Sequence, residues 1–391
     1  VLALGVLVLG TAQAQAAGGT LWVNDDASSY APPGSSCDRA GFPTIQSAVT
    51  AATAGSTINV CPGTYAEQVN VATPAKSGIT LRSVVPFGAT ILAPPTMEAV
   101  FGDLVTIDAG ARDVTLRGFV VSGPLPDQEF CAAQLRAGVR VKGGSSANIL
   151  GNRITKIRSA NPALRGCQNG FAIAVGRTFD VPVPGQVGQA TIVGNVIDTY
   201  QKGGIYADNV GTQVTITANA ILGDGPQSVV AQNGIQVSRG AKALIQSNTI
   251  QGNSFFTTTL PCVVDATCVT AAGIIVFETD NNVAIDRNDL RRNQTGIDIE
   301  TANGNSVTGN QILGETAPEI VATGFGDGIF LAADTAANRI VGNVSRNNVQ
   351  FDCEDDSTGP NRPALVANLW QKDEGLTQNK PGLCRASHND D

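Results

Sequence analysis

Two acidic residues in this sequence have the spacing that acid–base chemistry requires. Asp298 and Glu300 alternate with Ile297 and Ile299. On an extended strand both carboxyls project from one face, with their Cα atoms about 6.6 Å apart. The carboxyls of inverting glycoside hydrolases lie roughly 6.5–9.5 Å apart, so this pair could supply an acid and a base. Instead of acting as acid and base, Asp298 and Glu300 could bind Ca²⁺ through their carboxylate oxygens together with Glu278 from the preceding coil. The sequence indicates no other cofactor.

A second group of candidates is basic. Arg140, Lys142 and Arg177 could neutralise the carboxylate of a uronate sugar, and Lys142 or Tyr206 could then remove the proton alpha to it. Such β-elimination needs a base whose pKa is lowered by nearby positive charge. The candidates for substrate contact at neighbouring outward positions are Arg140, Arg177, Asp208, Gln236, Phe277 and Phe330. Exposed strands carry polar residues in any case, so a structural role is the simpler interpretation of each residue taken singly.

An internal repeat predicts the elements that position these residues. A pattern close to Ile-x-x-Asn-x-Ile occurs seven times between Ile149 and Ser345, and its shortest spacing, from Asn288 to Asn310, is 22 residues. A second pattern, Gly-Ile-x-Val, precedes most copies, as in Gly234–Val237. Short apolar alternations of this kind predict strands with one buried face. The repeat length therefore predicts the coils of a β-solenoid, and larger spacings predict inserted loops.

The repeated asparagine is expected at a tight bend between two strands, because asparagine tolerates left-handed backbone. Stacked on coils about 4.8 Å apart, its side-chain amides can bond to one another. The predicted ladder contains Asn152, Asn195, Asn219, Asn248, Asn288, Asn310 and Asn343.

Each coil is expected to run from the Gly-Ile-x-Val strand through a second strand, the Asn bend and a third strand. The long insertions then fall together before the next coil, at approximately 155–169, 198–203, 222–232, 251–271 and 313–326. Stacked loops would build a wall beside the first strands. The sequence thus predicts a groove parallel to the solenoid axis, a shape that suits an extended polymer.

The N-terminus and the cysteines indicate export. Val1–Gly10 is an uncharged apolar run followed by small-x-small cleavage patterns, which predicts a signal peptide truncated at its start. Eight cysteines favour disulfides in an oxidising compartment. Because solenoid coils contact only their neighbours, we expect cysteines to pair along the sequence. The expected bridges are Cys37–Cys61, Cys131–Cys167, Cys262–Cys268 and Cys353–Cys384. The predicted location is extracellular, with the periplasm or cell surface as alternatives.

Composition limits the partners. The 391 residues include 25 basic and 33 acidic side chains, a net charge of −8. This balance disfavours nucleic acid, which needs clustered basic residues. The single histidine, His388, lies near the C-terminus and no Cys-x-x-Cys occurs, so a zinc site is not expected. No segment after the signal reaches the roughly 18 apolar residues of a membrane span. We expect a monomer that binds an extracellular polysaccharide.

The ends of a solenoid are open sheet edges that must be covered. Residues 45–52 have helical apolar spacing, with Thr44 as a candidate N-cap and Gly55 as a stop, and predict a short capping helix. The acidic run Asp352–Asp356 is interpreted as a solvated terminal loop. The expected divisions are a signal peptide at 1–16, an N-terminal cap with first coils at 17–78, the β-helix at 79–350 and a loop-rich tail at 351–391.

The segments Phe42–Ala48 and Ile58–Glu67 resemble the N-terminal cap and first coils of pectin-lyase-like proteins. The Asn-x-Ile coils are similar to parallel β-helix repeats, including those of the NosD type. Over about residues 40–350, the resemblance implies an all-β, right-handed parallel β-helix of about ten coils. The catalytic Gln-Asp-Thr and Leu-Trp-Gly-Arg of pectin methylesterases, the Asp-Pro-His-Glu of alginate epimerases and the Gly-His-Gly of polygalacturonases are absent. Tyr65 and Glu67 are therefore interpreted as structural, and no subfamily is indicated.

Two functional hypotheses follow. The first is a secreted protein that recognises a polysaccharide along the groove and, if catalytic, cleaves it as a lyase or a glycoside hydrolase. The second is a non-catalytic cell-surface or matrix module that binds glycan or packs against other proteins. The mixed charge of the groove favours the first hypothesis, and the missing catalytic motifs favour the second.

Overall fold

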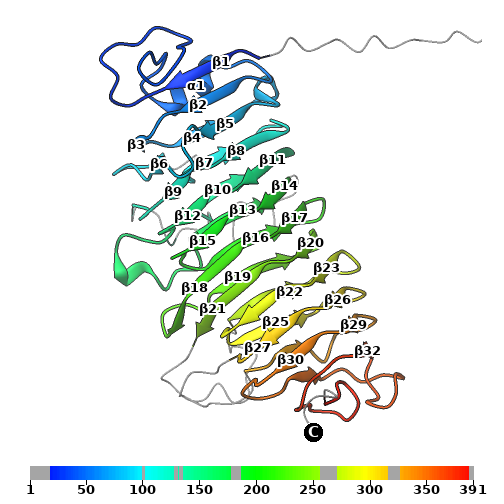
Figure 1. Ribbon diagram of the computed structural model, residues 1–391. Helices are drawn as coiled ribbons and strands as arrows, with labels where there is room; N and C mark the ends of the chain where they lie inside the picture. The colour runs from blue at the N-terminus through cyan, green and yellow to red at the C-terminus, as the bar shows by residue number, and fades with distance from the viewer. Residues whose placement is uncertain are drawn as a thin grey trace, which may run out of the picture.

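The computed structural model describes residues 18–98, 102–126, 131, 135–177, 186–255, 271–315 and 326–386, so the expected signal peptide lies outside the described residues. The strands form three parallel sheets of 10, 12 and 10 strands. Their coils stack along one axis from β1 to β32 (Figure 1). The fold is the predicted right-handed parallel β-helix.

The first sheet contains the Gly-Ile-x-Val strands. Its members are β4 (Val69–Val71), β7 (Val105–Ile107), β10 (Ala137–Val141), β13 (Phe171–Gly176), β16 (Gly203–Asp208), β19 (Asn233–Ser238), β22 (Ala272–Phe277), β25 (Thr295–Glu300), β28 (Ile329–Leu331) and β31 (Cys353–Asp355). The inward-facing Ile, Val and Leu residues of these strands are buried in the common core, as the alternation predicts.

The second and third sheets lie before and after the Asn bend. The second contains β1 (Thr20–Val23), β2 (Thr57–Val60), β5 (Thr80–Ser83), β8 (Val114–Arg117), β11 (Ser145–Leu150), β14 (Gly188–Val193), β17 (Gln213–Thr217), β20 (Lys242–Gln246), β23 (Val283–Asp286), β26 (Ser306–Thr308), β29 (Arg339–Val341) and β32 (Leu369–Gln371). The third contains β3 (Gly63–Ala66), β6 (Ala89–Leu92), β9 (Val120–Ser122), β12 (Arg153–Thr155), β15 (Val196–Asp198), β18 (Ala220–Gln227), β21 (Thr249–Phe255), β24 (Asp289–Arg291), β27 (Gln311–Leu313) and β30 (Val344–Arg346).

The predicted asparagine ladder is confirmed by its hydrogen bonds. Nδ2 of Asn219 donates to Oδ1 of Asn248 at 2.9 Å, while its Oδ1 accepts from Nδ2 of Asn195 at 3.0 Å. The same contact links all seven predicted asparagines. The ladder ends on Asp373, which accepts from Nδ2 of Asn343 at 2.8 Å.

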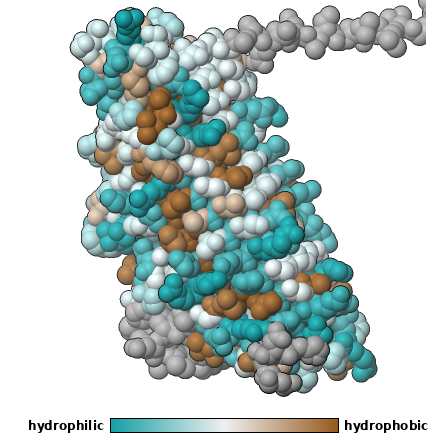
Figure 2. All heavy atoms as spheres, in the orientation of Figure 1, coloured by the Kyte–Doolittle hydropathy of each residue, from teal (hydrophilic) through white to brown (hydrophobic). Residues whose placement is uncertain are grey.

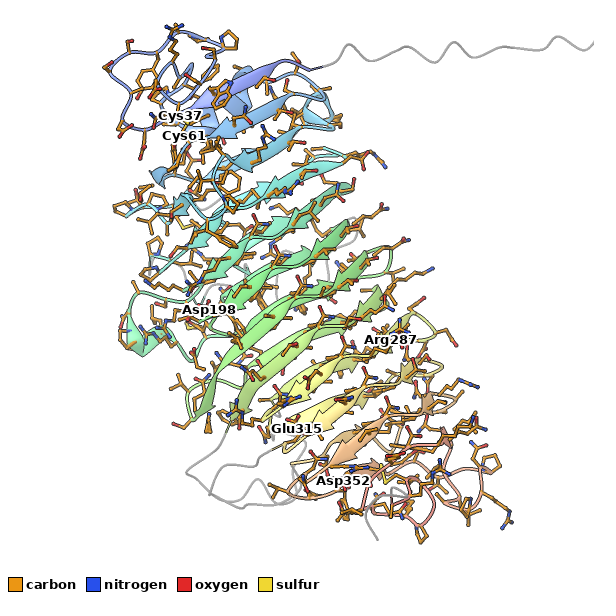
Figure 3. All side chains as sticks on the ribbon, in the orientation of Figure 1. Cys37, Cys61, Asp198, Arg287, Glu315 and Asp352 are labelled. Carbon is orange, nitrogen blue, oxygen red and sulfur yellow. A yellow bond between two sulfur atoms is a disulfide. The ribbon has the colours of Figure 1, made fainter. Side chains whose placement is uncertain are left out.

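A second ladder was not predicted. It runs from Asn253 to Asn293, whose Nδ2 donates to Oε1 of Glu315 at 3.4 Å. The backbone N–H of Glu315 then donates to Oδ1 of Asn348, whose Nδ2 donates to Asp352 at 2.7 Å. Glu315 and Asp352 both lie toward the C-terminal end of the coils (Figure 3). Carboxylates therefore accept the final hydrogen bonds of both ladders.

The helix α1 (Ile45–Ala51) packs against β1, β2 and β4 at the N-terminal end. Oγ1 of Thr44 accepts from the backbone N–H of Ser47 at 3.1 Å, the expected N-cap contact. The helix ends with Ala52 as its C-cap, before Gly55. Two short 3₁₀ turns occur at Pro74–Lys76 and Pro162–Leu164. No helix in the described part of the chain is long and apolar enough to cross a membrane.

Three of the four expected disulfides are present. They join Cys37 to Cys61, Cys131 to Cys167 and Cys353 to Cys384. Cys37 and Cys61 meet near the N-terminal end in Figure 3. The fourth expected bridge, Cys262–Cys268, lies outside the described residues.

At the C-terminal end, β31 and β32 continue the first and second sheets into the region expected to be a tail. The interpretation of Asp352–Asp356 as a solvated loop is wrong for most of the run, because Asp352, Glu354 and Asp355 are buried in and beside β31. The face shown in Figure 2 is mainly hydrophilic, with separate hydrophobic patches.

Candidate functional site

The first sheet aligns most of the predicted site residues in two columns on its outer face. Strand register places Arg140, Ala174, Tyr206, Gln236, Ile275, Asp298, Phe330 and Glu354 in the first column. The second contains Gly176, Asp208, Ser238, Phe277 and Glu300. Successive members are one strand spacing apart, about 4.8 Å. The columns are basic at one end and acidic at the other.

The basic end is neutralised inside the protein. Arg140 is fully buried, with Nε 3.4 Å from Oδ2 of Asp103. Its guanidinium also donates to the carbonyl oxygens of Leu135 and Arg177. Nζ of Lys142 lies 3.7 Å from Oδ2 of Asp108. These two cations therefore have internal acidic partners, which the sequence analysis did not identify.

Tyr206 belongs to a buried network at the centre of the sheet. Its hydroxyl donates to Oδ2 of Asp208 at 2.7 Å and accepts from Nη1 of Arg177 at 2.8 Å. Asp208 also lies 3.3 Å from Arg177 and 3.7 Å from Arg239. Burial raises the pKa of Tyr206, and the charge of Asp208 raises it further. This direction is opposite to the one that a base for β-elimination requires.

The acidic end contains Asp298, Glu300, Asp327 and Glu354, which we call the carboxyl cluster. Asp298 is 1% exposed and Glu354 is 7% exposed. Oδ1 of Asp298 and Oε2 of Glu354 have no hydrogen-bond partner among the described residues. Oδ1 of Asp327 accepts from the backbone N–H of Phe351 at 3.0 Å. Glu300 is only half-buried, so the cluster combines deep carboxyls with one near the surface.

Burial raises the pKa of every carboxyl in the cluster. The pKa of Asp298 is raised first by burial and then by the charge of Glu300, whose own pKa is raised by burial and by Asp334. Burial raises the pKa of Asp327 to about 7 and that of Glu354 to about 9. Asp327 and Glu354 also act on each other, and the pair therefore retains a proton near neutral pH. Such groups can act as acids at the pH where ordinary carboxyls are ionised.

These pKa values predict that stability falls as pH rises. The folded chain retains protons on Asp327 and Glu354 that the unfolded chain releases near its ordinary carboxyl pKa. The stabilisation is complete below about pH 4 and is lost as pH rises through 7 to 9. We expect Tm to be lower at pH 9 than at pH 5 by on the order of 5 °C. In thermal unfolding, the difference in Tm between pH 5 and pH 9 should be smaller for Glu354→Gln than for the wild type. The control Glu98→Gln, at an exposed position, should keep the wild-type difference. Equal Tm values of the wild type at the two pH values would contradict the prediction.

Partly exposed aromatic rings flank the carboxyls. Phe330 pairs with Asp298 in strand register, and Phe277 pairs with Glu300. Gln236, also partly exposed, donates from Nε2 to Oγ of Ser238 at 3.0 Å. Oε2 of Glu278 lies 4.0 Å from Nε of Arg239. In the described part of the chain, no group of three or more His, Cys, Asp or Glu side chains is arranged to hold a metal ion.

The expected insertions connect the third sheet to the first. They leave the ends of β12, β15, β18, β21 and β27. Residues 256–270 and 316–325, within two of these insertions, lie outside the described residues. The wall that these loops were expected to build therefore stays a prediction.

The second sheet has a polar hollow of about 390 Å³ on its outer face, which the sequence analysis missed. Its wall includes Asn148, Gln189, Thr191, Gln213, Thr215, Lys242 and Leu244. The outward Gln and Thr of β14 and β17 alternate with buried Ala, Val and Ile, and this alternation was the available signal. Among the described residues, the side-chain amides of Asn148, Gln189 and Gln213 are not paired within the chain.

Comparisons with known proteins support the architecture. Residues 183–361 match the family model described as a right handed beta helix region. A search of curated proteins finds no match. The structure of XylC with xylose is similar, with 13% identity and a TM-score of 0.57, and the match covers 84% of this chain and 69% of that one. A double mutant of the periplasmic alginate epimerase AlgG has 14% identity and a TM-score of 0.43, covering 82% and 62% of the two chains. Pectin methylesterase from carrot has 12% identity and a TM-score of 0.45, covering 91% and 88%.

Proposed function

We propose that this chain, a right-handed parallel β-helix protein, acts outside the cytoplasm on a polysaccharide that binds over the carboxyl cluster and is hydrolysed there. The observation that carries the proposal is Asp298, a buried carboxyl with an unpartnered oxygen beside the partly exposed Glu300. The three disulfides support an oxidising compartment. The structure of XylC with xylose shows that a protein of this fold binds a sugar.

The two carboxyls suit the two roles of an inverting hydrolase. Asp298, whose pKa is raised well above its usual value by burial, holds a proton and donates it to the glycosidic oxygen. Glu300, nearer the surface, accepts a proton from the attacking water. Their Cα atoms lie two strand positions apart, about 6.6 Å, a spacing within reach of the carboxyl separation of inverting hydrolases. Phe277 and Phe330 supply apolar faces for the sugar rings on either side.

Hydrolysis is favoured over elimination by the state of the basic residues. Lys142 is 3.7 Å from Asp108, and the hydroxyl of Tyr206 donates to Asp208. The raised pKa of Tyr206 makes its phenolate scarce at neutral pH. Neither Lys142 nor Tyr206, the two candidate bases, is therefore prepared to remove a proton alpha to a carboxylate.

An activity screen tests the proposal. Purified protein is incubated with neutral and uronate polysaccharides, with and without Ca²⁺. Reducing-sugar release and the ultraviolet absorbance of unsaturated ends are measured together. We expect new reducing ends without unsaturated product. Unsaturated ends would instead assign elimination to the basic end, and a strict requirement for Ca²⁺ would favour the metal role of Glu278, Asp298 and Glu300.

A second candidate function, non-catalytic glycan binding, is favoured by the polar hollow of the second sheet. Its unpaired amides and hydroxyls can bond sugar hydroxyls along several coils. Retention of the protein on a polysaccharide without any product would support this module. In that case Gln213→Ala should weaken retention, whereas Phe330→Ala should not.

A further inference from the structure

We infer that the polysaccharide at the carboxyl cluster is a neutral glycan rather than a polymer of uronates. This inference rests on the proposed function and names its substrate class. It follows from which charges are accessible on the first sheet and which are already paired.

Acidic groups surround the proposed site. Besides the four carboxyls of the cluster, the charge of Asp334 acts on Glu300 and that of Asp356 acts on Asp327 and Glu354. Lys380 also acts on Glu354, but its Nζ donates to the carbonyl oxygen of Ser357 at 2.6 Å. A uronate carboxylate on each sugar would meet like charge at successive positions. Like charges placed together in a partly buried interface strongly disfavour binding.

The basic residues that could compensate are committed elsewhere. Arg140 and Arg177 are buried, and they lie 3.4 Å from Asp103 and 3.3 Å from Asp208 respectively. Arg239 lies 3.7 Å from the same Asp208. Freeing Arg140 for a uronate would remove the cation that neutralises buried Asp103, and freeing Arg177 or Arg239 would remove one of the two cations beside buried Asp208. The basic end of the columns is therefore part of the scaffold.

The groups that remain suit uncharged sugars. Phe277 and Phe330 are partly exposed and can stack on the apolar faces of sugar rings. The carboxyl of the partly exposed Glu300 can accept hydrogen bonds from sugar hydroxyls.

The test compares two polymers with the same sugar backbone, one with ionised carboxylates and one with uncharged methyl esters. Full-length Asp298→Asn protein, which binds without turnover, is titrated at pH 8 and low salt with polygalacturonate and with the same polymer fully methyl-esterified. An unsubstituted xylan of similar length serves as a second neutral probe. We expect the neutral polymers to bind at least about tenfold tighter, a difference of 1.4 kcal/mol. Added salt should reduce this difference in affinity, because it screens the repulsion between the site and the carboxylates of polygalacturonate.

A charge-removing variant sharpens the test. Adding Glu300→Gln to the Asp298→Asn protein should raise the affinity for polygalacturonate relative to the affinity for its methyl ester. Adding Glu98→Gln, on the exposed surface near β4, should leave the ratio of the two affinities unchanged. Equal or tighter binding of polygalacturonate overturns the neutral class while retaining polysaccharide binding. Absence of binding to all polymers, neutral and charged, overturns the proposed function itself.

Discussion

Asp298→Asn is expected to lower the rate of polysaccharide hydrolysis by about 10²- to 10⁴-fold, the usual contribution of a positioned acid. An amide has nearly the same shape as a protonated carboxyl, so the buried position stays filled. It cannot supply a proton to the leaving oxygen. The loss should therefore appear in kcat, measured by release of reducing ends, while binding of the polymer is retained.

The matched control is Asp289→Asn. Asp289 lies on β24 of the third sheet, where its carboxyl accepts two hydrogen bonds from Arg291, away from the cluster. Its replacement should leave the rate unchanged. The wild-type rate should also fall at high pH, as Asp298 loses its proton, and this alkaline limb should disappear in Asp298→Asn. An Asp298→Asn protein with full activity would remove Asp298 from the mechanism.

The coils were predictable because their stacking repeats one physical requirement. Each Gly-Ile-x-Val strand must place its branched residues inside, and each bend must satisfy the same buried backbone groups, as Asn219 does for Ile192 and Asn195. The repeated pattern therefore identified seven of the ten strands of the first sheet and all seven members of the ladder. It also placed Asp298 and Phe330 on neighbouring strands in the same column.

The site was predicted less completely because its decisive contacts join residues outside the repeat. Asp103, the partner of Arg140, is 37 residues away in a coil without the Asn motif. Asp327 lies just before β28 and Glu354 lies within β31, where an acidic run is usually interpreted as solvated. Which charges are paired or buried depends on neighbouring coils. The sequence therefore indicated a column with basic and acidic ends but not the neutralisation of the basic end.

The residues that end the two ladders were likewise not predicted from the sequence pattern. Asp373 accepts hydrogen bonds from Asn343, the last asparagine of the first ladder, and Asp352 accepts them from Asn348, the last asparagine of the second. An acceptor is all that a final position requires, so a carboxyl can replace the amide there. Burial raises the pKa of Asp373 to about 6. The internal asparagines of the first ladder differ, because each side chain both donates and accepts a hydrogen bond.

Asn219→Ala should therefore destabilise the protein more than any ordinary surface substitution. The change removes the acceptor for the backbone N–H and Nδ2 of Asn195, and the donor for the carbonyl oxygen of Ile192. These groups are in the buried interior, where each unsatisfied one costs about 1–3 kcal/mol. We expect the free energy of unfolding to fall by about 3–6 kcal/mol, measured by urea denaturation at pH 5.

Asn148→Ala provides the comparison, because Asn148 is a partly exposed asparagine on the outer face of β11 in the second sheet. Its replacement should change stability by no more than about 0.5 kcal/mol. Asn219→Asp should behave like Asn219→Ala rather than like the wild type, since a carboxylate accepts from Asn195 but cannot donate to Ile192 or to Asn248. A loss of less than about 1 kcal/mol in Asn219→Ala would show that the ladder merely accompanies the bend, whose stability would then come from the packed Ile and Val alone.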